Sequence, residues 1–224
     1  MTINPTEHDP KDVYKILIGS IVPRPIAFVS SVDAQGVLNL PPFSFFNACS
    51  ANPPIVCFSC SFRAGTGTGK DTLNNIRQTG EFVVNIVSEA IAGQMNMTAG
   101  EYPPDVDEFV VSGLTPVPSE LVRPPRVAES LVQMECKLQQ IVVVSDKPMG
   151  AALVIGEVVR FHVDDSIVDN FRIAHEDQEY LKAGAGMPQD YVDYIMVYEA
   201  NANGYPAGTA NDKTSDSAIS SSLV

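Results

Sequence analysis

A glycine-rich loop with a basic residue at each end is the first segment of this sequence that could do ligand chemistry. It reads Arg63-Ala64-Gly65-Thr66-Gly67-Thr68-Gly69-Lys70. A P-loop for nucleoside triphosphates has a Gly where Ala64 stands, and a Ser or Thr where Asp71 follows the Lys. The dinucleotide fingerprint also fails, because its third Gly falls at Lys70. The pattern therefore argues against both kinds of nucleotide site.

The same loop has the composition of a site for a single phosphate group. Glycine lets backbone N–H groups approach an anion closely, and Arg63 and Lys70 add positive charge. A helix is expected to begin at Asp71 or Thr72, so its dipole favours an anion there, and the Thr72 hydroxyl adds a donor. We therefore predict a phosphate site at Arg63, Lys70, Asp71 and Thr72. The alternative is a surface loop without a ligand.

A second segment mixes aromatic with small polar side chains. Its sequence is Asn39-Leu40-Pro41-Pro42-Phe43-Ser44-Phe45-Phe46-Asn47-Ala48-Cys49-Ser50. A flat heteroaromatic ring is bound by apolar walls together with a few backbone and side-chain hydrogen bonds. The mixture fits such a ring, and it fits equally well a core strand that ends in a polar loop.

Neither the cysteines nor the histidines form a recognisable catalytic or metal-binding pattern. Cys57 and Cys60 lie in an apolar run, where an offset of three places them on opposite faces of a strand. We therefore expect no metal, and predict buried, reduced cysteines. His162 is expected to be a packed or edge histidine of a strand, and Arg24 faces either a ligand or solvent. The catalytic residues stay unassigned.

Charge and hydropathy argue against several classes of function. The chain has 14 basic and 27 acidic residues, which gives a formal net charge of −13. Such a surface repels phosphate backbones and anionic lipids, so we predict neither nucleic acid nor membrane as a partner. There is no apolar run of about 18 residues, and residues 1–15 are polar, so neither a membrane span nor a secretory signal is expected. We predict a cytoplasmic protein.

The elements that must position these segments are mostly strands. Apolar runs bounded by turn signals predict strands at residues 26–32, 37–46, 55–62, 82–87, 131–144 and 152–163. Pro41 and Pro42 cannot donate to a ladder, so the second strand needs a bulge, an edge or a bend. Helices are expected from Asp71 or Thr72 to Gly80 and over residues 89–99. Many strands with few helices between them predict a mainly β fold, an antiparallel barrel or sandwich.

The rest of the chain is expected to hold loops and a tail. The proline-rich stretch 102–125 predicts loops with one small helix, and residues 178–183 are expected to be helical. The length fits one domain, which we place at residues 1–199. From about Ala200 the composition shifts to Asn, Gly, Ser, Thr and Asp, which is typical of a flexible tail over residues 200–224.

Several stretches between Tyr14 and Val163 share their order and spacing with one known family. They are Arg24-Pro25-Ile26-Ala27-Phe28-Val29-Ser30-Ser31, Asp33 with Gly36 and Asn39, Pro42-Phe43-Ser44-Phe45-Phe46-Asn47, Pro53-Pro54, Lys70-Asp71-Thr72 with Asn75-Ile76, Glu81-Phe82-Val83-Val84-Asn85, Asp107-Glu108-Phe109 through Gly113-Leu114-Thr115, Glu135-Cys136, and Ile155-Gly156-Glu157-Val158-Val159. In these stretches the chain resembles the flavin reductase-like, FMN-binding split-barrel family. This resemblance, not periodicity, implies an antiparallel split β-barrel with a flavin.

The resemblance also implies a function and a set of site residues. It implies an FMN-dependent oxidoreductase that passes electrons from NADH or NADPH through FMN to free flavin, a monooxygenase partner or a small molecule. The protein would be a homodimer with FMN near the interface. The cofactor-binding residues carried over are Ser30 and Ser31 by the flavin, Asn39, the backbone of Ser44, Phe45, Phe46, Asn47 and Ala48 along the ring, and Lys70, Asp71 and Thr72 at the phosphate, assisted by Arg63.

Two departures concern the nicotinamide side and the C-terminal contacts. Ala185 stands where members of the family often carry an Arg in a Gly-rich stretch before a Tyr. Gly150-Ala151 stands where some related reductases carry a His.

Other functions also stay open: a non-enzymatic, flavoredoxin-like FMN electron carrier, an FMN-binding protein without nicotinamide turnover, or a β domain without flavin.

Overall fold

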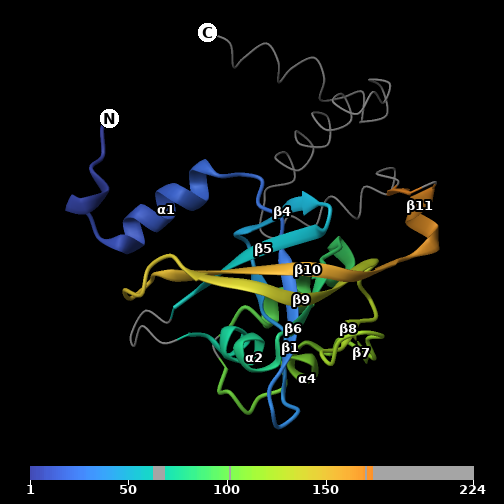
Figure 1. Cartoon of the computed structure of the whole chain (residues 1–224). Coiled ribbons are helices and arrows are strands. Elements are labelled where there is room, and N and C mark those ends of the chain that lie inside the picture. The colour runs from blue at the N-terminus through green and yellow to red at the C-terminus, as the bar shows by residue number, and fades with distance from the viewer. Residues whose placement is uncertain (63–68, 101, 170, 174–224) are drawn as a thin grey trace. The chain divides into compact units, whose positions relative to one another are not determined.

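The computed structural model describes residues 1–62, 69–100, 102–169 and 171–173 (Figure 1). Arg63, the helix expected over residues 178–183 and the tail expected over residues 200–224 lie outside these ranges, as does the domain boundary near residue 199. These expectations therefore stay predictions.

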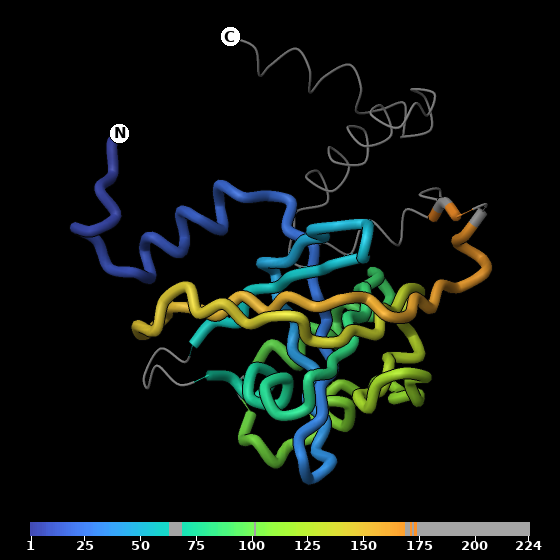
Figure 2. The backbone as a smooth tube through the Cα atoms, in the orientation of Figure 1, coloured from blue at the N-terminus to red at the C-terminus, as the bar shows by residue number. Residues whose placement is uncertain are grey.

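An antiparallel sheet of eight strands is the main element, as the strand pattern predicts. The strands are β1 (Ala27–Val32), β2 (Leu38–Asn39), β3 (Pro42–Phe43), β4 (Phe46–Ala51), β5 (Pro54–Ser61), β6 (Glu81–Ile86), β9 (Val132–Val143) and β10 (Ala151–Val163). Their order is β2-β1-β6-β9-β10-β5-β4, with β3 also paired to β1. β9 and β10 form a long hairpin (Figures 1 and 2). Two further pairs are β7 (Pro116–Val117) with β8 (Arg126–Val127), and β11 (Val168–Asp169) with β12 (Arg172–Ile173).

One chain segment links the two ends of this sheet. β3 pairs with β1, and β4 begins three residues after Phe43 and pairs with β5. Between β3 and β4, the Phe45 carbonyl accepts a hydrogen bond of 2.8 Å from Ser59 N. The sheet is not closed by continuous strand pairing. Its two ends are instead joined by this segment, which is the arrangement of a split barrel.

The structure refines the expected strand over residues 37–46. That stretch divides into β2, β3 and the start of β4, and Pro41 lies at the first break because it cannot donate to a ladder. The polar loop that the alternative reading placed near Asn47 and Ser50 is a strand, β4, and continues to Ala51. These residues have weak strand propensity, and pairing with β5 overrides it.

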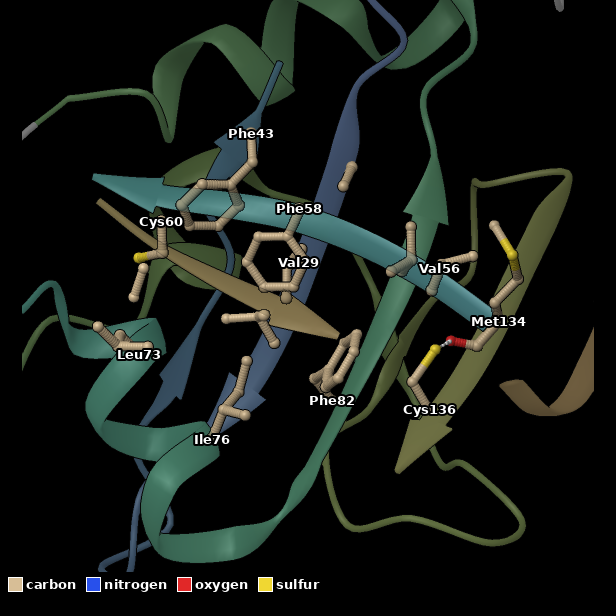
Figure 3. Packing of buried hydrophobic residues seen from close by; sticks show 14 of the residues in the cluster. Val29, Phe43, Val56, Phe58, Cys60, Leu73, Ile76, Phe82, Met134 and Cys136 are labelled. Atoms are coloured by element: carbon tan, nitrogen blue, oxygen red, sulfur yellow. Dashed lines mark hydrogen bonds between the residues drawn. The ribbon is translucent and has the colours of Figure 1, made fainter. Parts of the chain in front are cut away.

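Aromatic and aliphatic side chains fill the barrel (Figure 3). The ring of Phe58 lies 4.8 Å from that of Phe43 and 5.6 Å from that of Phe82, centroid to centroid. Leu73 and Ile76 extend from the neighbouring helix into the same cluster and have no exposed surface. Burying such a side chain stabilises the fold by about 1.5–3 kcal/mol, so this packing anchors the helix to the barrel.

That helix, α2 (Asp71–Thr79), begins and ends close to where the sequence predicts. It stops at Gly80, whose φ of 69° is left-handed and whose N–H bonds to Ile76 O at 2.8 Å. The helix begins at Asp71, as expected. The N-cap is Lys70, which makes no side-chain capping bond. Thr72 lies in the first turn of the helix, and its hydroxyl donates a hydrogen bond to Asn39 in β2.

The buried carboxylate of Glu135 is one of the groups that hold the proline-rich stretch to the barrel. Glu135 accepts hydrogen bonds from Glu120 N at 2.8 Å and Leu121 N at 2.7 Å, and lies 2.6 Å from His162 Nε2. Burial by itself raises the pKa of this carboxyl, but the three hydrogen bonds outweigh burial and lower the pKa. His162 is thus a packed histidine, as predicted.

The described residues include six further helical segments. They are η1 (Pro5–Glu7), α1 (Pro10–Ser20), η2 (Glu89–Ile91), α3 (Ala92–Met97), α4 (Glu108–Ser112) and η3 (Asp165–Ile167). The expected helix over residues 89–99 is confirmed as η2 with α3, and the small helix of the proline-rich stretch is α4. Within the described ranges, no helix has the length and hydropathy to span a membrane.

Candidate functional site

A pocket of about 90 Å³ lies at the N-terminus of α2. Three parts of the chain that are distant in sequence form its walls: the β2–β3 segment, the start of α2, and residues 98–108. The lining residues are Asn39, Pro41, Pro42, Lys70, Asp71, Thr72, Thr98, Ala99, Gly100, Tyr102 and Glu108. Four residues of the predicted cofactor-binding set are therefore brought together: Asn39, Lys70, Asp71 and Thr72.

A chain of hydrogen bonds crosses the wall of this pocket. Thr72 Oγ1 donates to Asn39 Oδ1 at 2.6 Å, and Asn39 Nδ2 donates to Glu108 Oε2 at 3.1 Å. The backbone N–H of Leu40 donates to the same carboxylate oxygen. Glu108 thus fixes which way the Asn39 amide points, and Asn39 in turn fixes the Thr72 hydroxyl.

The charges of the pocket are closer to balance than its residue types suggest. Lys70 contributes a cation, while Asp71 and Glu108 contribute two carboxyl groups. Burial raises the pKa of Glu108 to about 7, against the Leu40 N–H bond and the charge of Lys70. Asp71 and Asp107 raise this pKa further by repulsion. Near neutral pH Glu108 is therefore about half protonated, which reduces its repulsion of an anion in the pocket.

The start of α2 adds backbone groups and a dipole to this site. The N–H groups of Leu73 and Asn74 donate inside the helix, to Lys70 O at 3.0 and 3.2 Å, so they are not the groups that an anion would use. An α-helix leaves the N–H groups at its N-terminus without acceptors inside the helix, and its dipole places partial positive charge there. Thr72, in the first turn, lines the pocket. The arrangement suits an anion with several oxygen atoms, such as a phosphate group.

The two predicted serines of β1 differ in their surroundings, although both are fully buried. Ser31 Oγ accepts a bond of 3.1 Å from Asn75 Nδ2 and lies 3.5 Å from Asn39 Oδ1, so it adjoins the network of the pocket. Ser30 Oγ donates instead to the Pro125 carbonyl, on the proline-rich stretch. The structure therefore connects Ser31, and not the Ser30 hydroxyl, to the pocket.

The predicted ring-binding stretch begins beside the pocket and runs along the edge of the sheet. Pro42 lines the pocket, and Ser44 follows two residues later. Phe46 is half-buried, whereas Asn47 and Ala48 are exposed on β4. None of the residues predicted to line the ring, Ser44, Phe45, Phe46, Asn47 and Ala48, lines the pocket itself. A ligand held by both would extend from the pocket along β3 and β4.

The surroundings of Arg24 and of the cysteines show what these candidate residues contact. Arg24 Nη1 donates to Ile21 O at 3.2 Å and also to Ile18 O, so it satisfies carbonyl groups at the end of α1. Cys60 is buried, as predicted, but Cys57 is half-buried and Cys49 is exposed, so the prediction of buried cysteines is wrong for these two. In the part of the chain that is described, no group of three or more His, Cys, Asp or Glu side chains could hold a metal ion.

Sequence reasoning missed the wall formed by residues 98–108. Glu108 follows Asp107, whose side chain accepts from Phe109 N and caps α4 at 2.8 Å. The Asp-Glu-Phe pattern shows a helix start, but it does not show that Glu108 is only 5% exposed. Tyr102 and Thr98 lie in a stretch whose composition indicates no ligand, so only the three-dimensional fold places them in the pocket.

Comparison with known proteins defines the class of this protein. A family model described as flavin reductase like domain matches residues 18–182. An uncharacterized protein of Aquifex aeolicus is 43% identical over 171 residues, which cover 76% of this chain and 85% of that relative.

Two solved structures have the same fold. Nitrilotriacetate monooxygenase component B from Bacillus cereus has 43% sequence identity and a TM-score of 0.75, over 79% of this chain and 87% of its own. The 2-nitrobenzoate 2-nitroreductase NbaA of Pseudomonas fluorescens has 29% identity and a TM-score of 0.70, over 79% of this chain and 84% of its own. The chain therefore belongs to the flavin reductase-like family, and its fold is the split barrel of that family, as the resemblance predicted.

Proposed function

We propose that this protein is an FMN-dependent oxidoreductase that takes electrons from NADH or NADPH. FMN supplies the redox chemistry when bound, because its ring accepts hydride and passes electrons onward. The observation that carries the proposal is the convergence of Asn39, Lys70 and Thr72 in one pocket at the start of α2, in a chain of the flavin reductase-like family.

The size and donors of the pocket fit the phosphoryl end of the cofactor. Pockets that enclose a whole ligand have roughly 300–1,000 Å³, whereas this one has about 90 Å³. Lys70 supplies the cation, and the first turn of α2 supplies N–H groups and the positive end of a dipole. The Thr72 hydroxyl already donates its proton to Asn39 Oδ1. Its oxygen can therefore accept a hydrogen bond more readily than the hydroxyl can donate one to a phosphate oxygen.

The ring of FMN would then lie along the β3–β4 segment. Ser44, Phe45 and Phe46 supply backbone groups and apolar contact, and the exposed backbone side of Asn47 and Ala48 extends this surface. Ser31 adjoins the pocket from β1. These contacts would orient a ring and exclude water from the face that they cover.

Hydride transfer from a nicotinamide to bound FMN would need no acid–base residue of the protein, because FMN would supply the redox chemistry. The electron acceptor would be free flavin, a monooxygenase partner or a small molecule. The similarity to a monooxygenase component supports a monooxygenase partner as acceptor, and the similarity to a nitroreductase supports a small molecule. Reduced nicotinamide as donor suits a cytoplasmic location.

We further propose a homodimer with FMN near the subunit interface. α1 has no buried residue; Tyr14 and Leu17 on it are 43% and 45% exposed, and Ile21, the C-cap residue that follows it, is 55% exposed. The ring of Tyr14 lies 6.2 Å from that of Phe45, in the proposed ring-binding stretch. A second copy that covers these apolar side chains would therefore lie close to the flavin.

An anaerobic spectroscopic titration tests the proposed reaction. The purified protein, reconstituted with FMN, should show a bound-flavin visible spectrum that bleaches on addition of NADH or NADPH. Each nucleotide is added separately, and free FMN at the same concentration is the control. No bound flavin after reconstitution would refute the proposal. If neither nucleotide reduces the bound flavin but a protein donor does, the protein is an electron carrier and not a reductase.

A further inference from the structure

Two cysteine thiols lie in contact on the outer strands of the sheet. The Sγ atoms of Cys49, in β4, and Cys57, in β5, are 3.2 Å apart. Cys49 is exposed and Cys57 is half-buried, whereas Cys60 and Cys136 have no exposed surface. The thiols of Cys49 and Cys57 are therefore in contact with each other and accessible to solvent, whereas those of Cys60 and Cys136 are buried.

The register of β4 against β5 explains the contact. Asn47 pairs with Cys57 and Ala48 with Val56, and then the register shifts before Ser50. Cys49 is the residue in this irregularity, and a bulge of this kind leaves one residue outside the ladder and bends its strand. The bend brings the Cys49 side chain to that of Cys57, although the two residues are not directly paired.

We propose that Cys49 and Cys57 form a reversible disulfide, and that small disulfides such as oxidised glutathione are the oxidant. The Cys49 thiolate attacks one sulfur of the small disulfide, forms a mixed disulfide and releases the first small thiolate. The Cys57 thiolate then attacks Cys49 Sγ, forms the Cys49–Cys57 bond and releases the second. Two protein thiols are oxidised, one small disulfide is reduced to two thiols, and the two thiol protons end on those products.

The surroundings of the two thiols set the order of these steps. Burial, followed by the hydrogen bond and the charge of Cys49, raises the pKa of Cys57 to about 11. Cys57 is therefore a poor first nucleophile, since only the thiolate attacks. Cys49 is exposed and meets the oxidant first. Cys57, already in contact with Cys49, resolves the mixed disulfide.

The structure leaves room for the bond to form. A disulfide joins its sulfurs at about 2.05 Å, so the two atoms must approach further. β4 ends the strand order, and among the described residues no strand pairs with its outer side. The exposed Cys49 side chain can therefore rotate towards Cys57 without displacing the core. The thiol pair requires no bound flavin.

The test is thiol counting combined with intact mass. The full-length protein is reduced, freed of reductant and incubated with oxidised glutathione, and then unfolded for titration of its thiols. We expect two of the four thiols to be lost, the mass to fall by about 2 Da, two hydrogen atoms, and dithiothreitol to restore both. Tandem mass spectrometry of a digest that cleaves between residues 50 and 56 should join Cys49 to Cys57.

Three single variants separate this proposal from general oxidation. Cys57→Ser should retain one glutathione on Cys49, because nothing resolves the mixed disulfide. Cys49→Ser should lose thiols at least about tenfold more slowly, because the exposed nucleophile is gone. Cys60→Ser, on the same strand as Cys57, should form the disulfide as the wild type does. Retention of all four wild-type thiols, or an unchanged rate in Cys49→Ser, would overturn the proposal.

Discussion

Glu108 accepts hydrogen bonds at one carboxylate oxygen from both the side-chain amide of Asn39 and the backbone N–H of Leu40. This joins α4 to β2 across the pocket at the start of α2. The carboxyl group is buried beside Lys70 and Asp71, so its protonation state changes the charge of the pocket.

The first prediction concerns the pH dependence of stability. Burial raises the pKa of folded Glu108 from 4.5 to about 7. Since the folded state binds a proton more tightly than the unfolded state, its contribution is full below pH 4.5 and is lost as the pH rises through 7. The loss is at most about 3 kcal/mol. Urea unfolding at pH 5 and pH 8 should show a smaller difference for Glu108→Gln than for the wild type.

The same substitution tests the role of Glu108 in the pocket. The FMN affinity of the wild type should weaken between pH 6 and pH 8 relative to Glu108→Gln, because ionised Glu108 repels the phosphate. Comparison with the variant cancels the ionisation of the phosphate itself. An identical pH dependence of FMN affinity in both proteins would exclude Glu108 from the site.

Lys70 should discriminate FMN from riboflavin. A hydrogen bond to a charged group contributes about 1.5–3 kcal/mol, so Lys70→Met should raise the Kd for FMN by about 10- to 160-fold. The Kd for riboflavin should stay nearly constant, since it has no phosphate. Fluorescence titration with both flavins measures the ratio. Lys147→Met, in the exposed β9–β10 turn, is the control, and an equal effect of both variants would contradict the assignment.

Gly156 is required for core packing. A Cβ at this position would lie 2.3 Å from Phe82 Cζ and 2.7 Å from Cε1, inside the barrel. Overpacking of a core costs about 1–3 kcal/mol, so Gly156→Ala should lower the free energy of unfolding by that amount. Gly93→Ala is the matched control, because nothing lies within 4 Å of its Cβ. In the helix α3 this change should be neutral or stabilising.

Glu135 should stabilise the fold in a way that acid removes. Its pKa is lowered in the folded state, so its contribution is present above the unfolded pKa near 4.5 and is lost as the pH falls. Glu135→Gln places an amide against the N–H groups of Glu120 and Leu121, and should cost about 1–3 kcal/mol at pH 7. The difference from the wild type should shrink below pH 4. A constant difference would show that charge is not involved.

The strands and α2 could be predicted from the sequence because their signals are local. Apolar runs bounded by Asp33–Gly36 and by prolines fix β1 and β5, and Gly80 fixes the end of α2. β4 could not be predicted in full, since Asn47 and Ser50 have weak strand propensity and only pairing with β5 makes them a strand. The family came from the ordered resemblance, not from periodicity.

Two of the three walls of the candidate site could be predicted from the sequence, because the resemblance already carried over Asn39 on the β2–β3 segment. Lys70, Asp71 and Thr72 adjoin a glycine-rich loop and a helix start, which is a local pattern for an anion. Residues 98–108 form the opposite wall through long-range packing, so no local pattern marks Glu108 as a pocket residue. The contact of Cys49 with Cys57 depends on a shift in strand register, which composition does not encode.

The most direct test of the central claim is a crystal structure of the protein soaked with FMN. We expect the phosphate in the pocket at the start of α2, within hydrogen-bond distance of Lys70 Nζ and of backbone N–H groups of the first turn, and the ring beside the Ser44–Ala48 backbone. A phosphate bound elsewhere, with Lys70 and Thr72 in no contact with FMN, would contradict the account.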